Sequence, residues 1–433
     1  MFEKVQFIGV ALCTTPSNLR SIEETSDEGF YAGIDNDIED IRNRFAFVRE
    51  TIKQICSSKE IDSSQKTLKI ITFPEFFMRG VLGAYYSTDS FYVEKMASNY
   101  MRQIVNDLVK AGLRIGNDYL FVLGTILSST SKIDYSVEPN ASLSQTGDNL
   151  LNIYYRLHPT EKNSSEKIQN SLPNILKILD DKEENVSLQQ KEEVDKEYID
   201  ILQKTLECCD TKATLNVCNR CLVYSGSSLM SSSYVKPAVI QKKYKSKEDF
   251  ILNTKKSDKV TVKEKYLQTT SIYPHINTSQ GELKKDPLDG LSILEYEGLK
   301  IGVEICLDHS RQRLVNHLYR NPNDYVDLQI VISCGMSVRE KSVIAKQGGY
   351  IFNCDGEYEL HNNKKGVDGR FCHTSLQKIE KHIEVSNQKV LSEANLSSAY
   401  STTKQINGYV SGKVPLYPFE NYQIHIYTPL DLK

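Results

Sequence analysis

The chain has 433 residues, of which 39% are hydrophobic, and it carries a formal net charge of −3 at pH 7. This apolar fraction is enough for a sizeable core, and the balanced charge argues against the basic surface that nucleic-acid-binding proteins use. No stretch approaches the roughly 20 consecutive apolar residues that a membrane-spanning helix needs. We therefore expect neither a nucleic-acid nor a membrane partner.

The N-terminus and the cysteines indicate where the protein works. The opening sequence MFEKVQFIGVALCTTP has only a short apolar run with an acidic residue in front of it, which is typical of a first buried strand rather than of a secretion signal. Ten cysteines in a chain of this length are typical of reduced thiols. Together these features predict a cytoplasmic protein.

The N-terminal part of the chain alternates between two patterns. Apolar runs rich in β-branched residues predict buried strands, and apolar residues at helical spacing predict amphipathic helices. This alternation is typical of an α/β layered sheet. In chain order the predicted elements are strand 5–12, helix 40–58, strand 67–77 stopped by Pro74, helix 91–113 and strand 118–127.

Two polar stretches interrupt the pattern. Residues 142–217 are rich in charge and predict an inserted segment that is partly helical or disordered, and residues 253–290 form a second polar insertion. We treat the whole chain, 1–433, as one domain that carries these insertions. The remaining predicted strands are 219–226, 234–244, 326–336, 349–356 and 421–430, with a hairpin at 291–306 that turns at Glu297 and Gly298.

Glu75 is the first candidate for chemistry. It follows an apolar strand directly and has two phenylalanines beside it, in FPEFF. A carboxylate desolvated in this way has a raised pKa and can serve as a general base. The alternative is a structural acid that pairs with nearby Arg79 or caps a helix.

The second candidate is a lysine in QKKYKSKED. Strand side chains alternate between faces, so Lys243 and Lys245 share one face while Lys242 shares the other with Tyr244 and Ser246. Lys242 is therefore the lysine that could point inward. From this pattern alone it could equally be another surface charge, and Lys243 and Lys245 remain alternatives.

The third candidate is Cys306, in IGVEICLDHS. A buried cysteine is often only a small apolar side chain, but here an apolar strand ends in a thiol with Glu304, Asp308 and His309 around it. The reactive form of a cysteine is the thiolate, so a base or a cation nearby would activate it. Asp308 and His309 are candidates for positions near such a site.

A glutamate, a lysine and a cysteine that each follow a strand, in that chain order, resemble the nitrilase superfamily of carbon–nitrogen hydrolases. FPEFFMRG is similar to the glutamate motif of that family, and GLKIGVEICLDH is similar to its nucleophile motif. The resemblance covers about two-thirds of the chain and implies an α-β-β-α sandwich with a Glu75–Lys242–Cys306 triad. It also implies a second acid near the lysine, for which Glu248 and Asp249 are the candidates.

The resemblance further implies a reaction. Glu75 would take the proton of Cys306, the thiolate would attack an amide or nitrile carbon, and Lys242 with the backbone N–H of Leu307 would stabilise the oxyanion. It implies a small-molecule amide or nitrile substrate, no cofactor and a homodimer. Two alternatives remain: an acyltransferase that passes the acyl group to an amine, and a catalytically silent binding protein.

A second cysteine cluster, ECCDTKATLNVCNRC, raises the question of a metal site. Cys218 and Cys221 have a spacing that is common among zinc ligands. However, residues three apart on a strand point to opposite faces, and adjacent Cys208 and Cys209 are an unusual ligand pair. We therefore expect small buried thiols and no metal.

Overall fold

The computed structural model of the chain describes thirteen ranges and leaves gaps between them. Within them no helix is both long enough and apolar enough to cross a membrane. The described residues are 2–15, 31–34, 36–81, 83–86, 92–132, 214–230, 237–244, 292–320, 324–357, 373–384, 392–410, 415–418 and 421–432.

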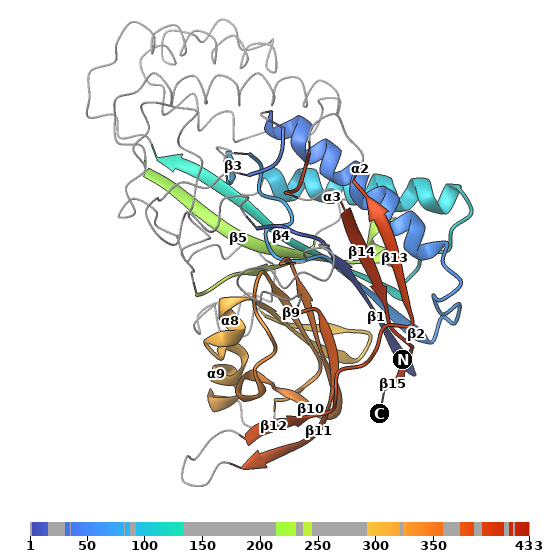
Figure 1. Cartoon of the computed structure of the whole chain (residues 1–433), viewed down its shortest axis with the longest axis vertical. Helices are drawn as coiled ribbons and strands as arrows, with labels where there is room; N and C mark the ends of the chain where they lie inside the picture. The colour runs from blue at the N-terminus through green and yellow to red at the C-terminus, as the bar shows by residue number, and fades with distance from the viewer. Residues whose placement is uncertain are drawn as a thin grey trace, which may run out of the picture.

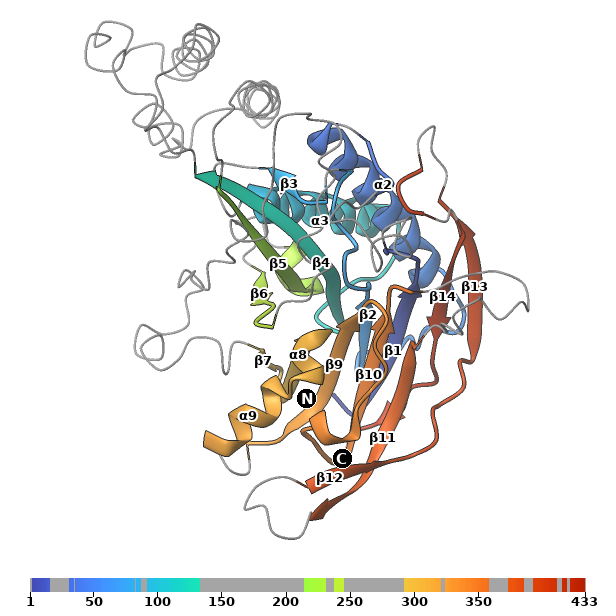
Figure 2. The ribbon, with the colours of Figure 1, turned by 60° about the vertical axis from the view of Figure 1, so that its left-hand side comes forward.

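Two β-sheets pack face to face (Figures 1 and 2). In the first sheet the central strands β1, β2 and β4 are parallel, and antiparallel strands extend it on both sides. Its strands, in spatial order, are β13 (Lys404–Tyr409), β14 (Asn421–Ile426), β1 (Lys4–Ala11), β2 (Thr67–Thr72), β4 (Tyr119–Lys132), β5 (Thr214–Ser225) and β6 (Ala238–Gln241), with β15 (Leu430–Asp431) paired to β1 and β3 (Tyr85–Tyr86) paired to β4.

The second sheet has the same plan. Its centre, β8, β9 and β10, is parallel, and antiparallel strands flank it. The order is β12 (Ser392–Leu396), β11 (Ser375–Glu384), β10 (Ala345–Asp355), β9 (Val326–Ser333), β8 (Leu299–Ile305) and β7 (Ile293–Tyr296).

Helices cover the outer face of each sheet, because parallel strands must be joined by crossovers. Helices α2 and α3 lie on the first sheet, and α8 and α9 lie on the second (Figure 2). The chain therefore forms an α-β-β-α sandwich, which confirms the predicted fold class. In the described ranges the helices are α2 (Asp37–Cys56), α3 (Tyr92–Lys110), α7 (Gly226–Met230), α8 (Leu307–Ser310) and α9 (Arg313–Arg320), with a 3-10 turn, η5 (Glu340–Ser342), before β10.

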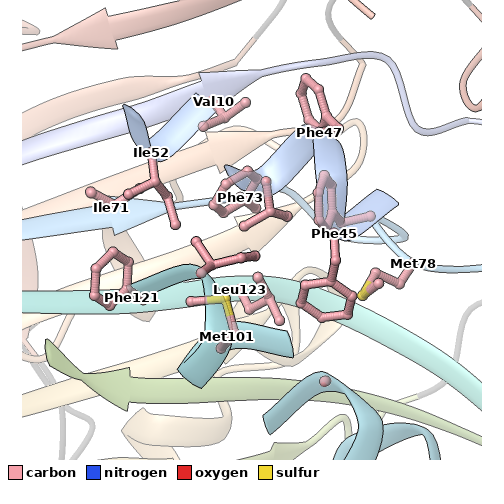
Figure 3. Close-up of a cluster of buried hydrophobic side chains, with 14 of the residues drawn as sticks. Val10, Phe45, Phe47, Ile52, Ile71, Phe73, Met78, Met101, Phe121 and Leu123 are labelled. Carbon is pink, nitrogen blue, oxygen red and sulfur yellow. The ribbon is translucent and has the colours of Figure 1, made fainter. Parts of the chain in front are cut away.

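Three layers of apolar side chains hold the sandwich together. On β1, Val5 and Phe7 lie between the two sheets, whereas Ile8 and Val10 belong to the layer under α2 and α3 (Figure 3). A third layer joins the second sheet to α9, for example through Leu314. Because side chains alternate along a strand, burial on both faces requires the unbroken apolar runs that the sequence shows.

The predicted elements agree with the structure at most positions. The hairpin at 291–306 is confirmed: Tyr296 pairs with Leu299, and Glu297 and Gly298 both have the positive φ that a two-residue hairpin turn needs. The sequence did not indicate β11, β12 and β13, whose apolar patterns are weak, nor the short helices α8 and α9.

Some predicted boundaries need correction. Strand β2 ends at Thr72 rather than at 77, and β6 ends at Gln241 rather than at 244, so Lys242 follows a strand instead of lying on it. Strand β5 begins at Thr214, so the predicted end of the first insertion, in 142–217, falls inside a strand. Residues 214–217 read TLNV, which alternates polar and apolar residues as a strand does, and they pair with the end of β4, which runs on to Lys132. The rest of that insertion and the second insertion, 253–290, lie outside the described residues.

Candidate active site

The strand directions bring three predicted residues to one edge of the sandwich. Strand β4 runs parallel to β2, β5 runs antiparallel to β4, and β6 runs antiparallel to β5, so β2 and β6 end on the same side. Glu75 follows β2 and Lys242 follows β6, while Cys306 follows β8 of the facing sheet. Segments far apart in the chain therefore meet where the two sheets touch.

A tight turn after β2 places Glu75. Strand β4 makes room for this turn with an irregularity between Val122 and Thr125. At Gly124, which has a φ of +69°, an added Cβ would stand 2.3 Å from the carbonyl oxygen of Pro74. The Thr125 hydroxyl then accepts the Phe76 N–H at 2.8 Å. Glycine is required here because no larger residue fits against the turn.

The backbone of Glu75 is tied to the rest of the sandwich on both sides. The hydroxyl of Thr14, just after β1, donates to the Glu75 carbonyl oxygen at 2.6 Å. The Glu75 N–H donates to the carbonyl oxygen of Ser333 at 3.3 Å, at the end of β9 in the second sheet. The residue is thereby fixed where the two sheets meet.

The Glu75 carboxylate is fully buried and accepts charged and neutral donors. Its Oε1 accepts Lys242 Nζ at 2.8 Å and Asn219 Nδ2 at 3.0 Å. Burying an ion pair costs desolvation, which close approach and further hydrogen bonds offset. Asn219, on β5, was not predicted from the sequence; its only signal was a polar residue at the start of an apolar strand.

Of the two lysines that the structure describes in this segment, Lys242 lies at the site. It is 6% exposed, its N–H donates to the Asn219 carbonyl at 2.9 Å, and its Nζ lies 5.7 Å from the centre of the Phe76 ring. Lys243 is only half-buried. Lys245 and the predicted second acids, Glu248 and Asp249, lie outside the described residues.

Cys306 has a strained backbone. Its φ of 45° and ψ of −102° are rare for a residue with a Cβ, and they occur where β8 gives way to α8. Ile301, Val303 and Ile305 of β8 face the layer between the sheets, so plain alternation would turn Cys306 away from that layer. The Cys306 side chain nonetheless packs against the layer between the sheets. We attribute this reversal to the positive φ.

The thiol of Cys306 lies among groups that act on its protonation. Burial raises its pKa well above the ordinary value, and the negative charge of Glu75 and a hydrogen bond to that carboxylate add to the rise. Lys242 and a hydrogen bond from the backbone N–H of Cys334 oppose it. The resting sulfur is therefore a protonated thiol at neutral pH, in contact with the carboxylate that could remove its proton.

Hydrogen bonds to a buried carboxylate hold the loop after β9, which brings the Cys334 N–H to the Cys306 sulfur. The buried carboxylate of Asp355 accepts the N–H of Gly335 at 2.7 Å and the Ser333 hydroxyl at 3.2 Å. Its other oxygen accepts the His373 N–H at 2.8 Å. Neither Cys334 nor Asp355 was singled out in the sequence, because their roles depend on the neighbouring strands.

His309 and Glu304 lie behind the nucleophile turn rather than beside the sulfur. Both are fully buried, and His309 Nδ1 lies 2.7 Å from Glu304 Oε2. The other ring nitrogen accepts the N–H of Arg339 at 3.0 Å, which puts the ring proton on Nδ1. Glu304 also accepts the N–H of Leu314 and the amide of Gln329. This network connects β8 to α9 and β9.

Asp308 is buried and reaches the lysine segment instead of the thiol. Its Oδ1 accepts the backbone N–H groups of Lys243 at 2.9 Å and Tyr244 at 2.8 Å. Leu307, whose N–H is the predicted oxyanion donor, is half-buried and opens the first turn of α8. The N–H groups of a first turn have no acceptor inside the helix.

The cysteines of the second cluster take different places. Cys218 and Cys221 are both buried on β5, and burial raises the pKa of the Cys221 thiol. Cys208 and Cys209 lie outside the described residues. Within the described ranges, no group of three or more histidine, cysteine and acidic side chains has the arrangement of a metal site.

Taken together, the fold and the site define an α-β-β-α sandwich with a glutamate, a lysine and a cysteine gathered where its two sheets meet. No protein-family model and no curated protein matches the chain. The crystal structure of a carbon-nitrogen hydrolase from Helicobacter pylori G27 is similar to it, with 6% sequence identity and a TM-score of 0.30 over 98% of this chain and 89% of that chain. Because this identity and this TM-score are so low, the evidence for the α-β-β-α architecture is the strand order and the layers of this chain, and not the likeness to that structure.

Proposed function

We propose that the protein is a hydrolase of non-peptide carbon–nitrogen bonds that works through a thioester on Cys306. The observation that carries this proposal is one carboxylate, Glu75, in contact with both a buried ammonium and a half-buried thiol. A base, a nucleophile and a cationic donor are the three groups that acyl transfer from nitrogen to sulfur requires. The substrate class is an amide, with nitriles and carbamoyl compounds as related cases.

The first half of the proposed reaction forms the thioester. Glu75 accepts the proton of the Cys306 thiol as the sulfur attacks the carbonyl carbon, and the carbonyl oxygen becomes an oxyanion. Lys242 Nζ and the N–H of Leu307 donate to that oxyanion. Glu75 then gives its proton to the leaving nitrogen, the carbon–nitrogen bond breaks, and an amine or ammonia departs.

The second half returns the enzyme to its starting state. Glu75 accepts a proton from water, whose oxygen attacks the thioester carbon. The second oxyanion collapses, the carbon–sulfur bond breaks, and the proton on Glu75 returns to the sulfur. The raised pKa of the Cys306 thiol fits this cycle, because such a sulfur is protonated at rest and depends on Glu75 at the moment of attack.

A substrate screen with product analysis tests the proposal. We expect a panel of short aliphatic and aromatic amides and nitriles to give ammonia or an amine with a carboxylic acid, and carbamoyl compounds to give ammonia or an amine with carbon dioxide. The Cys306→Ala variant is the control, and acyl-enzyme mass on Cys306 should appear with slowly hydrolysed substrates. If an added amine takes the acyl group in preference to water, the protein is an acyltransferase. If no acyl-enzyme and no product form with any compound, the binding-protein alternative replaces the proposal.

A further inference from the structure

The nucleophile turn and the lysine segment are joined by side chains that the proposed reaction does not use. Asp308, in the turn after Cys306, is fully buried. Its Oδ1 accepts the N–H of Lys243 at 2.9 Å and that of Tyr244 at 2.8 Å, and its Oδ2 lies 3.2 Å from the first of these. A single carboxylate therefore holds the backbone that follows Lys242.

Arg313, at the start of α9, holds the backbone on the other side of Lys242. Its Nη1 donates to the carbonyl oxygen of Gln241 at 2.8 Å and to Asp308 Oδ2 at 2.7 Å. The side chain is 1% exposed. Asp308 and Arg313 thus bind the residues before and after Lys242 and also bind each other.

This arrangement has a mechanical consequence. Strand β6 ends at Gln241, so Lys242 lies beyond the regular ladder of the sheet. A lysine has a flexible four-carbon stem, and its ammonium is aimed only as well as its backbone is held. An apolar pair of similar volume would fill the same space but could not accept these N–H groups or donate to the carbonyl.

We propose that Asp308 and Arg313 are positioning residues that aim Lys242 at Glu75 and Cys306, so that the nucleophile turn and the lysine segment act as one rigid unit. The inference rests on the proposed function, because it assigns Lys242 the role of donor beside the sulfur. Asp308 and Arg313 themselves touch neither the thiol nor the reacting carbon in this scheme.

The direction in which a change at Asp308 alters the reactivity of the Cys306 thiol separates a positioning role from a plain charge effect. The charged groups around the sulfur are Glu75, which raises the pKa of the Cys306 thiol, and Lys242, which lowers it. Asp308 interacts electrostatically with Lys242 and Arg313. Removing the Asp308 carboxylate, if only its charge mattered, would make the thiolate easier to form. If Lys242 instead lost its position near the sulfur, the thiolate would become harder to form.

The experiment measures the alkylation rate of Cys306 by iodoacetamide at about pH 8, with peptide mapping to separate it from the other cysteines. Below the thiol pKa this rate follows the thiolate fraction, and one pKa unit is a tenfold change. We expect Lys242→Met to slow it by about tenfold or more. We expect Asp308→Asn to slow it by about threefold, with little further loss in the double variant with Lys242→Met.

A matched control variant is Asp324→Asn. It removes the same charge from a partly exposed acid that binds Lys300 and His317, and it should leave the Cys306 rate unchanged. Thermal melting checks that each variant is folded. Arg313→Lys, which keeps the positive charge, is a milder second variant and should slow alkylation in the same direction as Asp308→Asn.

Each outcome decides between the claims. If Lys242→Met slows alkylation but folded Asp308→Asn or Arg313→Lys equals or exceeds the wild-type rate, the positioning role is wrong and the proposed function stands. If Lys242→Met itself leaves the rate unchanged, Lys242 does not act on the sulfur, and both proposals fall. Slower alkylation of Cys306 in Lys242→Met, Asp308→Asn and Arg313→Lys supports the positioning role.

Discussion

Two buried glutamates, Glu304 on β8 and Glu75 after β2, show how similar residues serve different purposes. Glu304 uses its oxygens to hold His309, Gln329 and the N–H of Leu314, all of them parts of the scaffold. Glu75 instead contacts Lys242 and the thiol of Cys306, which are two groups able to take part in chemistry. Burial of an acid is therefore a poor guide to function, whereas the identity of its partners is a good one.

The largest expected effect comes from removing the nucleophile. Cys306→Ala should lower turnover of an amide substrate by more than about a thousandfold, because the proposed reaction forms its thioester on the sulfur of Cys306. Steady-state kinetics with purified protein would measure it, and circular dichroism should show an unchanged fold. Turnover that survives at the wild-type level would place the reaction elsewhere.

Glu75→Gln should have opposite effects on turnover and on alkylation. Turnover should fall by about a hundredfold to ten-thousandfold, because the general base is lost. The negative charge of Glu75 raises the pKa of the Cys306 thiol, so the neutral amide lowers that pKa and increases the thiolate fraction. Iodoacetamide should therefore modify Cys306 faster than in the wild type at about pH 8. A slower reaction would show that the electrostatic assignment is wrong.

The same change on the other glutamate should affect stability instead. Glu304→Gln weakens a charge-assisted hydrogen bond to His309 in a fully buried network, so we expect a loss of about 2 kcal/mol in the free energy of unfolding. Urea denaturation would measure this loss. The folded fraction should keep far more turnover than Glu75→Gln does. Equal losses of turnover in the two variants would remove the distinction between the two acids.

The smallest effect concerns the strained backbone of the nucleophile. Glycine adopts the φ of 45° and ψ of −102° of Cys306 without the steric strain that a Cβ causes in alanine. Cys306→Gly should therefore be more stable than Cys306→Ala by about 1 kcal/mol, although both are inactive. Parallel urea melts of the two variants would show the difference. Equal stability would mean that the turn relaxes when the thiol is removed.

Much of this molecule was already determined by local sequence. Mainly apolar runs such as VQFIGVAL and LQIVIS favour strands buried on both faces, and their alternation with amphipathic helices indicated the layered architecture. Cys306 and Glu75 stood out because a reactive side chain directly followed such a run. The turn at Glu297 and Gly298 was equally local, because two residues determine it.

What only the tertiary structure decided involves partners distant in the chain. Strand alternation only made Lys242 the lysine that could point inward, and β6 ends before it; the pairing of β6 with β5 and the hydrogen bonds of Asp308 and Arg313 bring it to Glu75. His309 looked like a neighbour of the sulfur, yet its ring nitrogens bind Glu304 and the N–H of Arg339. The physical reason is the same in both cases. A local pattern sets which face a side chain prefers, but hydrogen-bond partners from other strands decide what it does there.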